Sequence, residues 1–206
     1  EMPPPPDPGG HFPGYAELQE SLRRTMAGND VDQLEEAFLQ LYAHLHMHES
    51  PYSVDERTRM DQTGGYWSHA GGISPIVKAA PHIQAHTVSA DYGAGNGLQG
   101  LLLQKLYPHR KTIQIEISSQ AVAIGRRLQD WLKIAEDRIE WIVGDVLDYP
   151  PTNVDFIYLY RPVRPQGQGV RFYQTLAKTV SESPTEVTIF SIADCLQDFL
   201  PPAFER

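Results

Sequence analysis

The segment DYGAGNG, residues 91–97, combines one carboxylate with three glycines at alternate positions. It follows residues typical of a strand and precedes residues typical of a helix that begins near Leu98. Glycine adds nothing to a core, so this density indicates an unusual backbone conformation or the close approach of another group. Missing side chains would let a ligand lie against the backbone, and a helix N-terminus offers it free N–H groups. The segment therefore predicts a cofactor-binding loop.

Further polar residues fall where later strands are expected to end. Glu116 ends the strand in TIQIEIS, where a carboxylate can accept hydrogen bonds from both hydroxyls of a ribose. Asp145 follows the strand in WIVGDVLDY, next to the backbone N–H of Val146, and the strand in VDFIYLYRP ends in Tyr160 and Arg161. Open α/β folds bind ligands at the carboxyl ends of their strands, so these residues predict one crevice.

The elements that must position these residues alternate between strand and helix from residue 87 onward. Strands are expected near 87–92, 112–117, 139–143, 154–160 and 187–192. Helices are expected near 97–106, 119–135 and 168–182, and the segment 144–153 is expected to be short or irregular. This alternation predicts a parallel sheet with covering helices. Before it, Tyr15, Leu18, Leu22 and Met26 recur at helical spacing, and Asp30 is placed to open a second helix.

Residues 88–162 resemble the class I S-adenosylmethionine (SAM)-dependent methyltransferases, whose first motif has the form acidic-x-Gly-x-Gly-x-Gly. DYGAGNG matches every fixed position of that motif. The resemblance implies an α/β, Rossmann-like, doubly wound and mostly parallel sheet of strand order 3-2-1-4-5. The family usually ends with a further helix and an antiparallel strand pair. Only ADCLQDFLPPAFER follows the fifth expected strand here, so that final pair is left open.

The resemblance also implies SAM as the cofactor. Asp91 would hold its methionine end, Glu116 its ribose, and Asp145 with Val146 its adenine. The residues implied to bind SAM are Asp91, Gly93, Ala94, Gly95, Gly97, Glu116, Ile117, Asp145 and Val146.

Two other functions fit parts of this pattern. GNGLQG also matches the G-x-G-x-x-G motif of NAD-dependent oxidoreductases, with Glu116 about 20 residues further on. That motif explains neither Asp91 before the glycines nor GDV after the third strand, so the methyl donor is favoured. The second alternative is a non-catalytic SAM-binding module whose N-terminal helices recruit a partner, because no general base is obvious.

The segment GGYWSHAGG, residues 64–72, carries the candidates for acceptor chemistry. Two glycine pairs flank aromatic and titratable groups, as in a loop that closes over a ligand. Tyr66 and Trp67 are expected to contact the substrate, and His69 could act as a general base because its ordinary pKa lies near neutrality. The competing interpretation places Trp67 in the core and His69 at a turn.

Tyr160 is the second candidate catalytic residue, and Arg161 and Arg164 are candidate substrate contacts. No acidic residue falls between Phe156 and Val180, so the arginines form a local positive segment that could bind an anionic acceptor. A solvated loop explains them equally well. The pattern favours a small-molecule acceptor over a macromolecule.

Composition limits the partners. The formal net charge of −9 argues against general nucleic-acid binding, and no apolar run is long enough to span a membrane. A single cysteine, Cys195, favours a reducing compartment such as the cytoplasm. His44 and His48 have a spacing that could hold a metal, but no cysteine cluster or H-E-x-x-H motif accompanies them, so no metal site is predicted.

The expected organisation is a flexible Pro/Gly-rich tail over 1–14, an N-terminal helical lid or cap over 15–60 and a SAM-binding Rossmann-like domain over 61–206. The sequence does not predict an oligomeric state.

Overall fold

The computed structural model describes residues 15–28, 30, 32–37, 40, 52–65, 73–192, 196–202 and 204. Its strands are β1 (Val88–Tyr92), β2 (Lys111–Glu116), β3 (Ile139–Val143), β4 (Phe156–Tyr160) and β5 (Thr188–Ile192). Its α-helices with defined bounds are α1 (Tyr15–Met26), α3 (Val54–Thr63), α4 (Ile73–Ala79), α5 (Leu98–Leu106), α6 (Ser119–Trp131) and α7 (Gln168–Ser181). Residues 32–37 are also helical.

The strands form one sheet in the order β3-β2-β1-β4-β5, and every neighbouring pair is parallel. This confirms the predicted Rossmann-like class and strand order. Because all strands run the same way, their carboxyl ends lie at one edge of the sheet, which we call the carboxyl edge. In the described residues that follow β5, 196–202 and 204, the chain forms no further strand.

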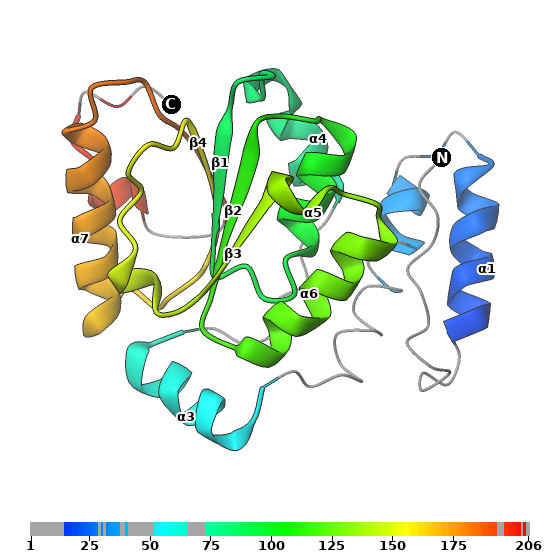
Figure 1. Cartoon of the computed structure of the whole chain (residues 1–206), viewed down its shortest axis with the longest axis horizontal. Coiled ribbons are helices and arrows are strands. Elements are labelled where there is room, and N and C mark those ends of the chain that lie inside the picture. Colours follow the sequence, from blue (N-terminus) through cyan, green and yellow to red (C-terminus); the bar gives the residue numbers. More distant parts are fainter. Residues whose placement is uncertain are drawn as a thin grey trace.

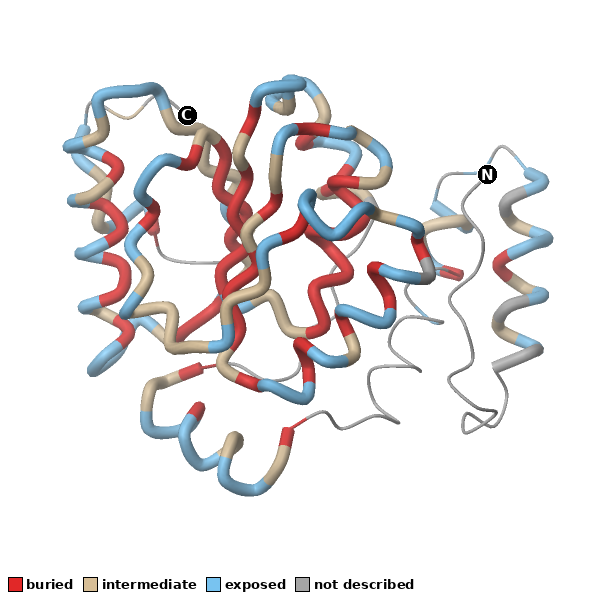
Figure 2. Tube along the Cα trace, viewed as in Figure 1, coloured by how far each residue is buried: buried red, intermediate tan, exposed pale blue. Residues whose placement is uncertain are grey.

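Helices cover both faces of the sheet (Figure 1). α4, α5 and α6 lie on one face, and α7 lies on the other. Side chains of a strand alternate between the two faces. Tyr158 of β4 therefore packs with Leu102 of α5, whereas its neighbour Ile157 packs with Leu176 of α7. Figure 2 shows the buried residues concentrated in the inner strands β1, β2 and β4 and on the helix sides that face the sheet.

The N-terminal helices are amphipathic, as predicted. They extend the hydrophobic core between the sheet and α5, which we call the α5-side core. Leu22 of α1 and Ala37 are both buried in the cluster that contains Leu102. Asp30 opens the second helix as expected, because its Oδ1 accepts a hydrogen bond from the Gln33 N–H at 3.1 Å.

α6 is shorter than the predicted helix over 119–135. It ends at Trp131, and Lys133 then adopts a left-handed backbone with φ of 54°. The N–H of Ile134 donates to the carbonyl of Gln129 at 3.1 Å, which closes the end of the helix. The periodicity continues past this point, but the backbone reverses.

A buried polar cluster ties β1 to β2 at the edge opposite the carboxyl edge. His109 Nε2 lies 2.8 Å from Ser89 Oγ and 2.9 Å from Thr112 Oγ1, and His109 Nδ1 lies 2.7 Å from the carbonyl of Tyr107. Burial lowers the pKa of His109. A neutral ring can donate from Nδ1 to the Tyr107 carbonyl and accept one of the two hydroxyl protons at Nε2, so the cluster is a structural one.

Candidate functional site

The glycine loop at the carboxyl edge adopts the backbone conformation that its composition predicts. Gly93, Gly95 and Gly97 have φ values of 77°, 59° and 70°, which residues with side chains rarely adopt. The N–H groups of Gly93 and Ala94 both donate to the carbonyl of Ile115, at 2.9 and 3.0 Å. The loop is thereby fixed to the end of β2.

The three glycines face different surroundings. A Cβ at Gly97 would lie 2.3 Å from the Trp141 ring and 2.5 Å from Gln114 Oε1, and one at Gly93 would lie 3.0 Å from Pro162. A Cβ at Gly95 would meet nothing nearer than the Tyr52 hydroxyl at 3.8 Å. The Trp141 and Gln114 side chains therefore occupy the space next to Gly97, whereas a Cβ at Gly95 would make only an ordinary van der Waals contact.

Glu116 is buried at the end of β2 with its carboxylate directed at the loop. Its Oε2 accepts from the Gly95 N–H at 2.8 Å, and its Oε1 accepts from the Ser118 N–H at 2.9 Å. Burial raises the pKa of Glu116, and these hydrogen bonds act in the opposite direction. The carboxylate thus lies beside Gly95, as the interpretation of the sequence requires.

Asp91 is a second buried carboxyl, at the end of β1. Burial, with the nearby Glu116 charge, raises its pKa to about 7, although a hydrogen bond from the Gly100 backbone opposes the shift. Two acidic groups in one buried region disfavour ionisation of each other. A cationic ligand group near them would relieve that cost.

Asp145 and Val146 lie at the same edge, after β3. Asp145 Oδ1 accepts from the Leu147 N–H at 3.0 Å, which caps the short turn η3 (Val146–Asp148). The Gly144 N–H donates to the carbonyl of Glu116 at 2.9 Å, so the ends of β2 and β3 are joined. These contacts fix where Asp145 lies relative to Glu116.

A cleft with about 350 Å³ of empty space, open to solvent, is lined by some of these groups. Five residues predicted to bind a cofactor line it: Gly93, Glu116, Ile117, Asp145 and Val146. Asp91, Ala94, Gly95 and Gly97 are not among its lining residues. Pro162 and Val163 form a further wall.

The remaining wall of the cleft comes from α3, which the interpretation of the sequence did not identify. α3 lies across the carboxyl edge (Figure 1), and Met60, Thr63 and Gly65 contribute to the lining. Gly65 forms a bridge with Val163, and the Gly64 carbonyl accepts from the Arg164 N–H at 2.8 Å.

The other end of α3 is fixed to the glycine-loop side. Burial raises the pKa of Glu56, but hydrogen bonds from Ser53 and Ser118 outweigh it and hold that pKa below its ordinary value. Ser53 caps the helix, and the Glu56 carboxylate accepts from the Ser53 N–H at 2.7 Å. The S-x-x-E signature in SVDE could have identified this helix start from the sequence. The predicted boundary at residue 60 falls inside the helix.

The candidate catalytic and substrate-binding residues do not line the cleft in the described part of the chain. Arg161 is exposed, and with Arg164 it flanks the lining residues Pro162 and Val163. Tyr160 packs against the α5-side core and is not among the lining residues. Tyr66, Trp67 and His69 lie outside the described residues, as do His44 and His48, so their roles stay predictions.

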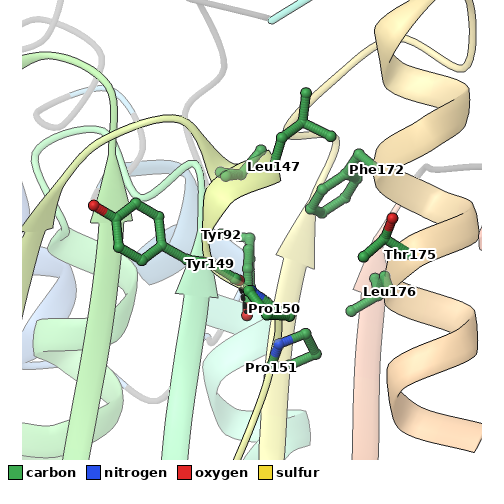
Figure 3. A pocket seen from close by; sticks show the side chains of 9 residues that line it. Tyr92, Leu147, Tyr149, Pro150, Pro151, Phe172, Thr175 and Leu176 are labelled. Atoms are coloured by element: carbon green, nitrogen blue, oxygen red, sulfur yellow. Dashed lines mark hydrogen bonds between the residues drawn. The ribbon is translucent and has the colours of Figure 1, made fainter.

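A second, smaller hollow lies on the α7 side of η3 (Figure 3). It has about 210 Å³ of empty space and is lined by apolar groups, among them Tyr92, Leu147 and Phe172. The Tyr92 hydroxyl donates to the carbonyl of Tyr149 at 2.9 Å. Val146 lines both hollows, so the two adjoin.

The described residues contain neither a metal-binding cluster nor a membrane-spanning helix. No group of three or more His, Cys, Asp or Glu residues in the described parts of the chain could hold a metal ion. None of the helices described has both the length and the apolar character needed to cross a membrane.

Comparison with known proteins gives similarity in fold only. No family model and no curated protein matches the sequence. Among solved structures, a SAM-dependent methyltransferase from Thiobacillus denitrificans in complex with S-adenosyl-L-homocysteine is 20% identical over 41% of this chain and 35% of that chain, with a TM-score of 0.37. A dimethyladenosine transferase from Plasmodium falciparum is 20% identical over 55% and 38%, with a TM-score of 0.42.

The [4+2]-cyclase SpnF is 16% identical over 56% of this chain and 46% of that chain, with a TM-score of 0.45. This chain spans less than half the length of each of these structures. At such identities and scores the similarity bears on the fold alone. The residues of the cleft are therefore the evidence for the ligand and the activity.

Proposed function

We propose that this chain is a SAM-dependent methyltransferase that binds SAM in the cleft at the carboxyl edge. The observation that supports it best is the hydrogen bond from the Gly95 N–H to Glu116, which places a buried carboxylate beside an open stretch of backbone. Asp145 and Val146 line the same cleft. These are the groups that the sequence motif assigns to the ribose and the adenine of the cofactor.

The residues present suit the charge of SAM. Glu116 would accept from the ribose hydroxyls, and Asp91 would lie toward the methionine end, where the cofactor carries its positive charges. The bound cofactor would supply a methyl group already activated by the sulfonium charge. Because the donor is activated, the chain has mainly to orient the acceptor and exclude water, a role that suits the apolar walls from Met60, Pro162 and Val163.

The acceptor is proposed to be small or anionic, and Arg161 and Arg164, which flank the lining residues Pro162 and Val163, suit an anionic one. α3 is proposed to cover the cofactor, as the C-terminal part of the lid predicted over 15–60. Tyr66 and Trp67 would then contact the acceptor. His69 would take its proton where one must be removed.

Calorimetry with S-adenosyl-L-homocysteine tests the cofactor. We expect the wild type to bind and Gly95→Val to give no heat, because a branched side chain at this positive φ of 59° disturbs the loop where its N–H bonds the Glu116 carboxylate. Gly167→Val is the control: Gly167 also has a positive φ, of 55°, and nothing lies within 4 Å of its Cβ position. The proposal fails if the wild type gives no heat at high micromolar ligand while NADH binds.

A non-catalytic SAM-binding module is the second candidate. One observation favours it: the described lining residues include no His, Lys or Tyr, and both carboxyl groups among them, Glu116 and Asp145, are the ones proposed to bind the cofactor. Incubation with methyl-labelled SAM and a set of acceptors separates the two functions. An enzyme transfers the label, whereas a module retains the cofactor without consuming it.

A further inference from the structure

The side-chain amide of Gln114, in the middle of β2, is buried without a partner. Gln114 is fully buried, and neither its Oε1 nor its Nε2 has a hydrogen-bond partner among the described residues. Burying an unsatisfied polar group destabilises the folded state, so folded proteins rarely retain one without a function. A neighbouring side chain that turns toward this amide would give it a partner.

The strand register identifies that neighbour as Asp91. In the β1–β2 pair, Asp91 lies directly opposite Gln114. Two positions earlier in each strand, Ser89 Oγ donates to Thr112 Oγ1 at 3.0 Å, so this set of side chains shares one face of the sheet. Residues two apart in a strand point the same way, and neighbouring strands lie about 4.8 Å apart. The carboxyl and the amide therefore lie side by side beneath α5.

Both groups also converge on the first turn of α5. Asp91 accepts a hydrogen bond from the Gly100 backbone. A Cβ at Gly100 would lie 3.0 Å from Gln114 Cδ and 3.0 Å from its Oε1. A glycine is thus needed at position 100 because the Gln114 side chain packs against it. This packing explains the third glycine of GNGLQG without a bound dinucleotide.

We propose that Gln114 is a positioning residue of the cofactor site: its amide pairs with the Asp91 carboxyl and holds that group against the glycine loop. An amide can serve both protonation states of its partner. It donates from Nε2 to the carboxylate and accepts at Oε1 from the protonated acid. Only the link from Asp91 to the cofactor rests on the proposed function.

The pairing predicts a pH effect. The groups that face Asp91 are Glu116 and Gln114 from β2, Tyr158 from β4 and the backbone of Gly100 in α5, and no cation contributes to its pKa. Gln114 Nε2 is then the side-chain donor available to the ionised form. Its removal disfavours the carboxylate and shifts ionisation to higher pH.

The experiment follows the Asp91 carboxyl carbon by ¹³C NMR in the ligand-free protein between about pH 5 and pH 9, in the wild type and in Gln114→Met. We expect the midpoint to rise by about one pH unit in the variant, since the amide bonds the charged form of the carboxyl more strongly than the neutral form. Gln104→Met is the matched control, because Gln104 is a buried amide that bonds the carbonyl of His109 at 2.8 Å, away from Asp91. Equal midpoints in wild type and Gln114→Met overturn the pairing.

A second measurement separates this proposal from the proposed function. If the wild type binds S-adenosyl-L-homocysteine, the pH at which affinity falls should rise in Gln114→Met together with the NMR midpoint. If it does not bind at any pH, the proposed function fails while the titration still decides the pairing. Should Gln114→Met not fold, the Gln114 side-chain NH₂ signals of the wild type must shift at the Asp91 midpoint, and a pH-independent NH₂ pair overturns the proposal.

Discussion

At the scale of single residues, the glycines of the loop are expected to respond differently to the same substitution. Gly97→Ala places a methyl group 2.3 Å from Trp141 and 2.5 Å from Gln114 Oε1, inside the packed layer under α5. We expect a loss of about 3 kcal/mol or more in the free energy of unfolding, from overpacking added to the cost of the positive φ. Urea denaturation measures it.

Gly95→Ala is the comparison for that experiment. Its methyl group meets nothing nearer than the Tyr52 hydroxyl at 3.8 Å, so only the backbone cost of about 1–2 kcal/mol applies. Equal losses in the two variants would contradict the separate roles assigned to these glycines.

Glu116 provides a second prediction, for binding rather than stability. In Glu116→Gln one carboxylate oxygen becomes an NH₂ group, which cannot accept from both the Gly95 and the Ser118 N–H. We expect the affinity for S-adenosyl-L-homocysteine to fall about tenfold or more, since a hydrogen bond to a charged group contributes about 1.5–3 kcal/mol. Calorimetry measures the change.

Glu140→Gln makes the same chemical change elsewhere in the sheet. Glu140 is exposed on β3 and pairs with Lys111 at 3.1 Å, so the affinity should stay at the wild-type value. An unchanged affinity in Glu116→Gln would remove the carboxylate from the cofactor site.

The sequence predicted which residues lie at the strand ends. It did not predict which side chains from other strands pack against those residues. The spacing of Asp91, Gly95 and Glu116 predicted one edge, because the order of strand, loop and helix is local information. The reason for Gly97 lies in Gln114 and Trp141, which come from other strands. No spacing along the chain reveals such a contact before the sheet is assembled.

At the scale of elements, α3 connects the two sides of the cleft. A mutation at its N-terminal end should loosen the helix without affecting the rest of the fold. Glu56→Ala removes the carboxylate that accepts from the Ser53 N–H and that Ser118 also reaches. We expect hydrogen exchange to become faster across residues 54–63, with about 1 kcal/mol lost locally and α7 unchanged.

Asp61→Ala controls for the loss of a carboxylate from the same helix. Asp61 is exposed and no hydrogen bond to its side chain is among those described, so exchange in α3 should match the wild type. Equal acceleration in both variants would mean that Glu56 does not fix the helix.

The strands and the main helices were predictable because a buried parallel sheet imposes long-range regularity on its sequence. α3 was not, although SVDE signals a helix start. Its position across the carboxyl edge depends on contacts with Ser118, far along the chain, and with Val163 through Gly65. A local capping signal says that a helix begins there and nothing about which surface it covers.

At the scale of the whole molecule, the buried acids link the candidate site to stability. Folding raises the pKa of Asp91 from 3.8 to about 7, so the native state favours the protonated form. The contribution of Asp91 to the free energy of unfolding is therefore fully present below about pH 4 and is lost as the pH rises through 7. His109 acts in the opposite direction: burial lowers its pKa, so its contribution is lost as the pH falls below about 6.5.

Asp91→Asn is therefore expected to stabilise the ligand-free protein by an amount that grows as the pH rises from about 4 to about 7 and then stays constant. The neutral amide avoids the cost of ionising a buried acid beside Glu116, which is up to about 4 kcal/mol at pH 8. The melting temperature of the variant should exceed that of the wild type at pH 8 and match it near pH 4. Asp148→Asn, at an exposed carboxyl after β3, should leave both temperatures unchanged.

The same substitution should weaken binding of a cationic cofactor, because the carboxylate that destabilises the free protein is the group that would attract it. Added SAM should then raise the melting temperature of the wild type at pH 8 more than that of Asp91→Asn. Two results would contradict this role for Asp91: a lower melting temperature of Asp91→Asn than of the wild type at pH 8, or an equal rise in melting temperature on adding SAM. In either case the Asp91 carboxylate does not attract the cofactor.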